Sequence, residues 1–275
     1  MRFCTIRRSG TTYAARVEGD VAVELPYADV GGLLADPQGL AVGRIHDGAR
    51  ARLDPNTLAP LVVRPPKVVC VGQNYAAHVA EMGHEPPRFP TFFAKYTSAL
   101  IGARDPINLS PDSQSCDWEV ELAVVIGTRA KRVDRDAALD HVAGYTVLND
   151  ISMRDYQKRT SQFLQGKTFE ATTPVGPWMV TADELPKGGD GLRVTCEVDG
   201  VMMQDSTTSD LIFDVATIIS YFSNVAALEP GDIIATGTPS GVGAGRRPPV
   251  FLRPGQVVRT SIEGIGELVN RVVGE

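Results

Sequence analysis

Two glutamates stand one residue apart in the stretch DWEVEL, which occupies residues 117–122. Because side chains at i and i+2 of a strand point to the same face, Glu119 and Glu121 are expected about 6–7 Å apart on that face. Carboxylates that close repel each other unless a proton, a basic side chain or a metal ion neutralises them. The pattern therefore indicates either a solvated strand face or a divalent-cation site, and the spacing alone leaves both open.

A third carboxylate, Asp150, ends the apolar segment AGYTVLND at residues 143–150. Functional side chains often project from the ends of regular elements into a pocket. Together with Glu119 and Glu121, Asp150 would form an all-oxygen site, which suits Mg²⁺ or Mn²⁺ and also admits Ca²⁺. An aspartate that merely caps a turn at a strand end is the alternative.

His78 and Glu81 lie three residues apart in NYAAHVAEM, residues 74–82, which reads as a short helix. Asn74 is a candidate N-cap for this helix and Gly83 a candidate stop. Residues at i and i+3 share a helix face, so Glu81 could orient the imidazole of His78. A carboxylate that orients a histidine is a common general-base arrangement. A surface ion pair is the alternative interpretation.

Several donors stand in Gly- and Pro-rich surroundings. Lys167 lies in FLQGKTFEATTPVGP, which predicts a shaped loop, and Arg154 and Gln157 lie in RDYQ. If they face the carboxylates, these side chains could hold a substrate carboxylate or a developing enolate oxygen. Thr238 opens the glycine-rich segment after IIATG, whose glycines would let backbone N–H groups approach a ligand. A dinucleotide fingerprint is rejected there, because Arg246 stands where a further glycine is required.

The composition excludes several function classes. A chain of 275 residues with 43% hydrophobic residues can build a real core. Its net charge of −6 argues against a nucleic-acid partner, and the four scattered cysteines suggest neither a zinc site nor a disulfide framework. No apolar run approaches the ~18 residues of a membrane span, and no signal peptide is evident. We expect a protein without a membrane partner, with the cytoplasm as the default location.

The positioning elements are mostly strands. Short alternating segments fill residues 1–62, and RPPK at 64–67 is a stiff connector, so a small N-terminal domain is expected at 1–65. Residues 66–275 would form the larger catalytic domain. The segment CDWEVELAVVIG (116–127) reads as one strand, half-buried at its start, and helices are expected at 134–143 and 214–228. The fold class is mixed α+β and β-rich.

Six ordered segments resemble the fumarylacetoacetate hydrolase family. They begin VGQNYAAHVAEMG, PTFFAKYTSALIG and DWEVELAVVIG and continue AGYTVLNDISMRDYQ, GKTFEATTPVGPW and PGDIIATGTPSGVG. The resemblance covers about 68–275 and implies a family-type β-roll catalytic domain behind a small N-terminal domain, usually as a homodimer. It implies that Glu119, Glu121 and Asp150 are ligands of Mg²⁺ or Mn²⁺.

The resemblance also implies roles for the other candidates. His78 matches the general base and Glu81 its partner. The positions near the substrate are matched by Lys167, Arg154, Gln157 and Thr238. Among these, Lys167 also matches a catalytic group. The implied reaction is hydrolysis of a carbon–carbon bond in a small acylpyruvate-type acid, as in catabolism of aromatic compounds. An isomerase or decarboxylase of a 2-oxo or 2-hydroxy diacid is the alternative, and a non-catalytic keto-acid binding module is a further one.

Overall fold

The central strand β10 (Val120–Ile126) is buried on both faces in the computed structural model, which describes residues 1–274. Its side chains divide between two apolar cores: Leu122 and Val124 belong to one, and Ala123 and Val125 belong to the other. This division follows from the two-residue repeat of a strand, in which successive side chains point to opposite faces. Both faces of the sheet must therefore be covered by other elements.

The main sheet is 11-stranded and mixed. From one edge to the other its path runs through β4 (Arg50–Arg52), β3 (Val21–Glu24), β2 (Thr11–Glu18), β1 (Arg2–Arg8), β13 (Thr173–Thr181), β11 (Val142–Asn149), β10, β16 (Ile233–Ala235), β5 (Val68–Gly72) and β6 (Thr91–Lys95), with β7 (Leu100–Ile101) paired to β13 off this path. The strand β10 pairs antiparallel with both β11 and β16, whereas β16 and β5 are parallel.

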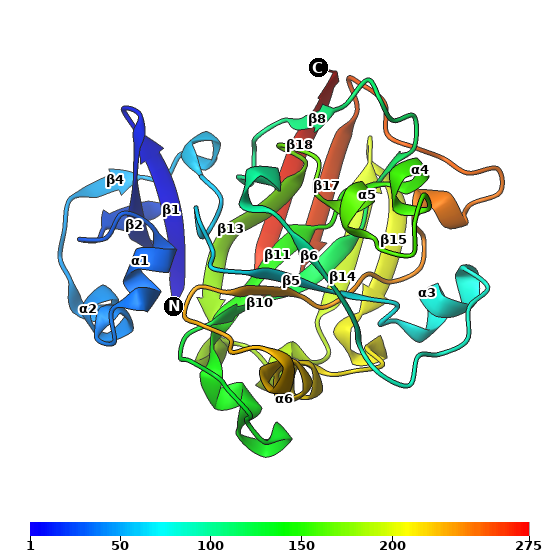
Figure 1. Ribbon diagram of the computed structural model, residues 1–275. Helices are drawn as coiled ribbons and strands as arrows, with labels where there is room; N and C mark the ends of the chain where they lie inside the picture. The colour runs from blue at the N-terminus through cyan, green and yellow to red at the C-terminus, as the bar shows by residue number, and fades with distance from the viewer. Residues whose placement is uncertain (275) are drawn as a thin grey trace.

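A second sheet of five strands covers the face of Leu122 and Val124, since its residues Val194, Val258 and Leu268 belong to the same core. Its order is β15 (Val201–Thr207), β14 (Arg193–Val198), β17 (Val257–Ile262), β18 (Gly266–Gly274) and β8 (Ile107–Leu109). Figure 1 shows β14, β15, β17 and β18, yellow to red, beside the green strands of the main sheet. The N-terminal strands, in blue, lie on the far side of β13.

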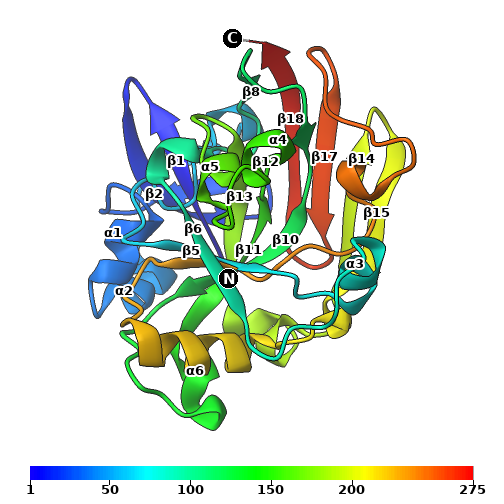
Figure 2. The same cartoon turned by 45° about the vertical axis from the view of Figure 1, so that its right-hand side comes forward.

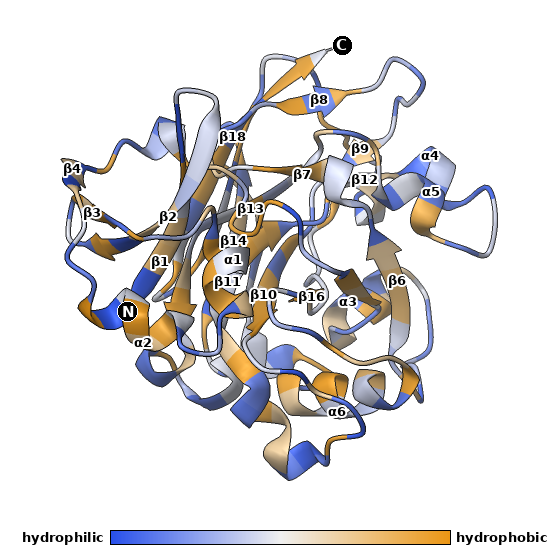
Figure 3. Cartoon of the chain, turned by 60° about the vertical axis from the view of Figure 1, so that its left-hand side comes forward, coloured by the Kyte–Doolittle hydropathy of each residue, from blue (hydrophilic) through white to orange (hydrophobic). Residues whose placement is uncertain are grey.

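Helices cover the remaining apolar surfaces. The helices α1 (Val30–Ala35) and α2 (Gly39–Ile45) accompany the N-terminal strands, and Leu33 joins the core of Ala123. The longest helix, α6 (Val215–Val225), buries Ile218 and Ile219 against the other core. In Figure 3 it shows both orange and blue residues, which is typical of an amphipathic surface helix.

Three short helices lie on the side of the molecule that carries the candidate site. They are α3 (Ala76–Glu81), α4 (Arg154–Gln157) and α5 (Leu164–Lys167), and Figure 2 shows α4 and α5 together while α3 stands apart from them. A two-stranded pair, β9 (Cys116–Asp117) with β12 (Ser152–Met153), precedes β10 and α4. The 3₁₀ helices are η1 (Pro55–Thr57), η2 (Thr97–Ala99), η3 (Arg135–His141), η4 (Ala182–Glu184), η5 (Lys187–Gly189), η6 (Thr208–Asp210) and η7 (Gly243–Gly245).

Two expected elements differ in detail. The expected strand at 116–127 is divided into β9 and β10, because the Glu119 N–H turns to the side chain of Asn149 (2.9 Å) instead of a strand partner. The predicted half-burial at its start is wrong, since Asp117 and Trp118 are fully buried. The helix expected at 134–143 is the 3₁₀ helix η3, after which Val142 begins β11. The helix expected at 214–228 is confirmed as α6, which ends three residues earlier at Val225.

The mixed α+β, strand-rich class is confirmed. The N-terminal strands continue the main sheet, because β1 pairs antiparallel with β13 at Arg2 and Phe3. Because one sheet runs through both predicted domains, the domain boundary expected at residue 65 stays a prediction. All four cysteines are buried free thiols. Within residues 1–274, we find no helix with the length and apolar character needed to cross a bilayer.

Candidate active site

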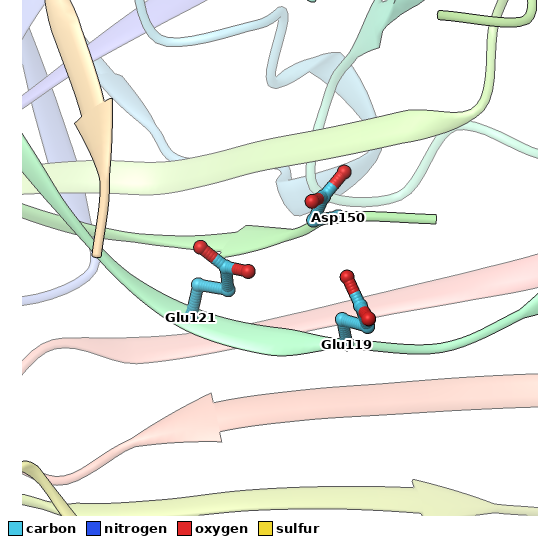
Figure 4. A group of neighbouring side chains, drawn as sticks. All are labelled: Glu119, Glu121 and Asp150. Carbon is cyan, nitrogen blue, oxygen red and sulfur yellow. The ribbon is translucent and has the colours of Figure 1, made fainter. Parts of the chain in front are cut away.

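Strand geometry brings the three predicted carboxylates together. Glu119 directly precedes β10, and Glu121 lies within it on the face that carries Ala123. Asp150 follows β11 directly, opposite Glu119, whose carbonyl accepts the Asp150 N–H at 2.8 Å. The three side chains offer carboxylate oxygens that all lie within 4.8 Å of one another. Figure 4 shows the carboxylates gathered around a common space. The interpretation of Glu119 and Glu121 as a solvated face is wrong, because both are buried.

Two of these carboxylates are neutralised by buried cations. Glu119 forms an ion pair with Arg154 (Oε1 to Nη2, 2.7 Å) and another with Lys167. Asp150 is held by Lys167 at 2.7 Å and by Lys95 at 2.6 Å. Burial opposes ionisation of Glu119, but the charges of Arg154 and Lys167 outweigh it and hold the pKa of Glu119 well below its usual value. Glu119 is therefore ionised.

Glu121 lacks such a partner. It accepts one hydrogen bond, from the Gly237 N–H at 2.8 Å, and within residues 1–274 it makes no ion pair. At an effective dielectric constant of ~20, two carboxylates at such separations repel by on the order of 3 kcal/mol, whereas one hydrogen bond contributes ~0.5–1.5 kcal/mol. Burial, together with the charges of Asp150 and Glu119, accordingly raises the pKa of Glu121 well above its usual value.

The charge balance of this region favours one more cation. The charged side chains buried here are the carboxylates of Asp117, Glu119, Glu121 and Asp150 and the cations of Lys95, Arg154 and Lys167. Carboxylates thus exceed cations by one, and the excess lies on Glu121. Clustered carboxylate oxygens are the ligands that Mg²⁺, Mn²⁺ and Ca²⁺ prefer. The donor set therefore fits a divalent cation, whose positive charge would compensate the excess carboxylate.

The helix α3 brings His78 and Glu81 to the same region. The Nδ1 atom of His78 lies 3.2 Å from Glu81 Oε2, and the other Glu81 oxygen accepts the Gly241 N–H at 2.9 Å. Burial raises the pKa of Glu81, but the hydrogen bonds from His78 and Gly241 outweigh it and hold that pKa below its usual value. Glu81 is therefore an ionised acceptor, which leaves His78 Nε2 as the ring nitrogen that is free to act on a ligand.

The expected caps of this helix are half confirmed. Gly83 follows the last turn with a φ of 73°, as a helix stop requires. The prediction that Asn74 caps the helix is wrong: Tyr75 is the N-cap residue, and no side chain caps it. The Asn74 amide instead donates to the carbonyls of Phe213 and Thr236 (3.0 and 2.7 Å) and accepts the Phe213 N–H. It ties the start of α3 to the segment after β16.

A cavity of about 260 Å³ joins these groups. His78 and the carboxylates of Glu119, Glu121 and Asp150 line it, together with the donors Arg154, Gln157, Lys167 and Thr238. Its apolar wall includes Phe93 and Phe163, whose rings meet edge to face with centroids 5.8 Å apart. A cavity that combines apolar walls with a few convergent polar groups is typical of a small-molecule site.

The four predicted donors all line the cavity. Lys167 ends α5 and is buried, not on the shaped loop that was expected. Arg154 opens α4 and bonds Gln157 on the next turn (3.0 Å), and Thr238 accepts a hydrogen bond from Gln204 at 2.8 Å. All nine predicted site residues therefore lie in or beside one cavity, while their roles stay predictions.

Sequence reasoning missed three buried polar residues. Lys95 is the one buried residue of β6, and its position in the apolar segment FFAKY was the available signal. Asp117 holds Arg154, and Gln204 holds both Thr238 and the Val120 N–H (3.0 Å). The glycines after β16 were expected to admit a ligand, but their N–H groups bond the carboxylates of Glu121, Glu81 and Asp117 instead.

Comparison with known proteins gives a consistent result. Residues 67–273 match the model of the fumarylacetoacetate (FAA) hydrolase C-terminal domain. The chain is 48% identical over 218 residues to the mitochondrial oxaloacetate tautomerase FAHD2B of Bos taurus. The aligned region covers 78% of this chain and 69% of that protein.

Two solved structures match over the whole of both chains. They are the fumarylacetoacetate hydrolase of Exiguobacterium antarcticum, with 34% identity and a TM-score of 0.87, and the 5-carboxymethyl-2-hydroxymuconate delta-isomerase of Mycobacterium smegmatis, with 34% identity and a TM-score of 0.83. The family model spans most of the chain, including every residue of the cavity described above. The chain therefore belongs to the fumarylacetoacetate hydrolase family.

Proposed function

We propose that this protein is a divalent-metal-dependent enzyme that moves a proton next to the keto group of a small 2-oxo acid. The best-supported reaction is keto–enol tautomerisation of a 2-oxo diacid such as oxaloacetate. The observation that carries the proposal is the meeting, in one cavity, of three buried carboxylates with the His78–Glu81 pair. The bovine relative described above is, by its name, an oxaloacetate tautomerase.

Glu119, Glu121 and Asp150 would hold the cation, for which Mg²⁺ or Mn²⁺ is proposed, with Ca²⁺ also compatible. When bound, a divalent cation acts as a Lewis acid that polarises carbonyl and carboxylate oxygens. Its two positive charges would turn the single negative excess of the region into a single positive excess. That balance would favour entry of an anionic keto acid.

Proton transfer falls to His78. Its Nε2 atom would accept the proton from the carbon next to the keto group, and the imidazolium would return it to the keto oxygen to give the enol. The two transfers balance, so the enzyme ends as it began. Glu81 would stabilise the imidazolium through Nδ1. This sequence needs no water as reactant.

Cationic and polar groups would bind the substrate oxygens. Lys167 lines the cavity and would offset the negative charge that grows on the keto oxygen. Arg154 and Gln157 would hold a carboxylate, since a guanidinium suits two-point recognition of that group. Thr238, which also lines the cavity, would supply a hydroxyl donor.

Hydrolysis of a carbon–carbon bond in an acylpyruvate is the second candidate. It is favoured by the likeness to fumarylacetoacetate hydrolase and by the same His78–Glu81 pair, which would then remove a proton from water. The hydroxide would add to the distal carbonyl, the bond between that carbon and the next would break, and the departing enolate would take up a proton. Both reactions pass through an enolate, so the same cations serve either.

A substrate panel tests these proposals. Oxaloacetate, acylpyruvates and hydroxymuconate-type diacids would be assayed with Mg²⁺ and with Mn²⁺, following enol absorbance, carboxylate release and CO₂. We expect accelerated enol–keto exchange of oxaloacetate without loss of carbon. Release of a carboxylic acid from an acylpyruvate would favour the hydrolase instead, and CO₂ the decarboxylase. Binding of all compounds without turnover of any would leave a keto-acid binding module.

We also propose a homodimer, as the family resemblance implies. Light scattering on the purified protein should give twice the mass of one chain. A mass equal to one chain at micromolar concentration would contradict this proposal.

A further inference from the structure

Asp117 lies behind the cavity, at the end of β9, and no role has yet been assigned to it. We propose that Asp117 is a positioning residue whose single carboxylate fixes two parts of the site: Arg154 on the substrate side, and the glycine turn at residues 241–245 that receives Glu81. The inference rests on the proposed function for its kinetic consequences, while its structural consequences can be measured without any substrate.

The carboxylate of Asp117 is fully buried and is saturated with hydrogen bonds. Its Oδ1 atom accepts the N–H groups of Trp118 (2.9 Å) and Gly243 (2.7 Å). Its Oδ2 atom accepts the N–H of Ala244 (2.9 Å) and the Nε–H of Arg154 (2.8 Å). A buried carboxylate with this many donors is rigid, so each donor is held in place.

The glycine turn lies in close contact with both Asp117 and Glu81. A methyl group on Gly243 would lie 2.8 Å from Asp117 Oδ1 and 1.9 Å from the Val250 carbonyl. On the other side of the turn, a methyl group on Gly245 would lie 2.6 Å from the carboxyl carbon of Glu81. Because the Gly241 N–H also donates to Glu81, a shift of the turn must move that carboxylate.

Arg154 is the second part that Asp117 fixes. Its guanidinium is forked, with Nε on Asp117 and Nη2 on Glu119, so that the remaining Nη1 faces Gln157. Asp117 itself is absent from the cavity wall, so it would act only through its partners. Catalysis depends on placement to within about 1 Å, and an error of that size can cost about 100-fold in rate.

The direct test is Asp117→Asn, which keeps the side-chain shape but replaces one acceptor oxygen by a donor. Steady-state kinetics in saturating Mn²⁺ should show kcat lower and KM higher, each by about tenfold or more. The matched control is Asp232→Asn, because Asp232 is equally buried and also pairs with a cationic side chain, Lys67 at 2.6 Å, but lies outside the cavity. The control should lose stability and keep both kinetic constants.

Two further variants each directly disturb one of the two parts that Asp117 fixes. Arg154→Lys keeps the charge but cannot span Asp117 and Glu119 together, so it should raise KM and the Kd of oxalate by a larger factor than it lowers kcat. Gly245→Ala pushes on Glu81 and should lower kcat with little effect on oxalate binding. Asp117→Asn should combine both effects, which a general loss of stability would not do.

Amide hydrogen exchange gives a readout that needs no turnover. In Arg154→Lys, where Asp117 is still present, the amides of Gly243 and Ala244 should exchange faster than in the wild type, since the carboxylate that accepts them is no longer fixed by the Nε–H of Arg154. This holds even if Asp117→Asn fails to fold. Unchanged exchange, or kinetic constants of Asp117→Asn equal to those of the Asp232→Asn control, would overturn the inference. If the wild type turns over no keto acid, the proposed function fails, and oxalate binding and exchange still decide the role of Asp117.

Discussion

At the scale of single residues, the proposed mechanism assigns the proton-transfer step to His78. Replacing it by glutamine should lower kcat by about 10²–10⁴-fold, the usual contribution of a general base. Mn²⁺ affinity should not change, because His78 is not one of the three carboxylates that would hold the ion. Steady-state kinetics and calorimetric Mn²⁺ titration check both statements. A fully active His78→Gln variant would remove His78 from the mechanism.

Glu121 gives the metal-free protein a pH dependence of stability. Its pKa is raised in the folded chain, so its contribution to stability is fully present below the unfolded pKa of about 4.3 and is lost as pH rises through the folded pKa. Glu119 and Glu81 have lowered pKa values and act in the opposite sense, at the acid end. Between about pH 5 and about pH 8, a range that lies above the unfolded pKa, ionisation of Glu121 should therefore make the metal-free protein less stable.

The variant Glu121→Gln tests this dependence. In excess chelator it should unfold at a higher temperature than the wild type at pH 8, because its side chain never ionises. Adding Mn²⁺ should raise the unfolding temperature of the wild type and leave that of the variant nearly unchanged. Thermal unfolding at several pH values checks both. Equal responses of the two proteins to Mn²⁺ would exclude Glu121 as a ligand.

The site residues divide according to how far sequence reasoning could reach them. Glu119 and Glu121 were accessible because the strand period puts both on one face, and His78 and Glu81 because the helix period does the same. Lys95 and Asp117 were not, because a lone charged residue in an apolar segment does not show which distant carboxylate or amide will satisfy it. Their partners lie on other elements, such as Asp150 after β11 and Gly243 after β16.

At the scale of elements, α6 provides a stability test that is independent of the site. The Asp214 side chain caps this helix by accepting the Thr217 N–H at 2.8 Å. Asp214→Ala should lower the free energy of unfolding by about 0.5–2 kcal/mol, the usual cost of losing an N-cap, and should leave kcat unchanged. Urea denaturation and kinetics provide the measurements. A change in kcat with no change in stability would contradict the assignment.

Element identities were easier to predict than their ends. The pattern at 214–228 correctly predicted α6, because its cap and apolar stripe are local signals. The break at Trp118 and Glu119 could not be foreseen, because it depends on the Asn149 side chain of a neighbouring strand. Asn74 is a similar case, since tertiary partners at Phe213 and Thr236 outcompete the helix end that its sequence position suggests.

At the scale of the whole molecule, the N-terminal strands share both apolar cores with the rest of the chain. Cys4 and Ile6 pack in one core with Val124, and Phe3 packs in the other with Val125. We predict that a fragment of residues 66–275 loses cooperative thermal unfolding or aggregates, because removing 1–65 exposes these surfaces. Calorimetry of the fragment beside the full chain checks this. A fragment with an unchanged unfolding transition would show that residues 1–65 form a separable domain.

The proposed chemistry depends on one divalent cation held by Glu119, Glu121 and Asp150. The most direct measurement is an anomalous difference map at the manganese edge from a crystal of the Mn²⁺-loaded protein. One strong peak should lie within ligand distance of oxygen atoms from all three carboxylates, about 2.0–2.6 Å as for other hard cations. A fully loaded crystal without a peak between these side chains, or with its peak elsewhere, would contradict the central claim.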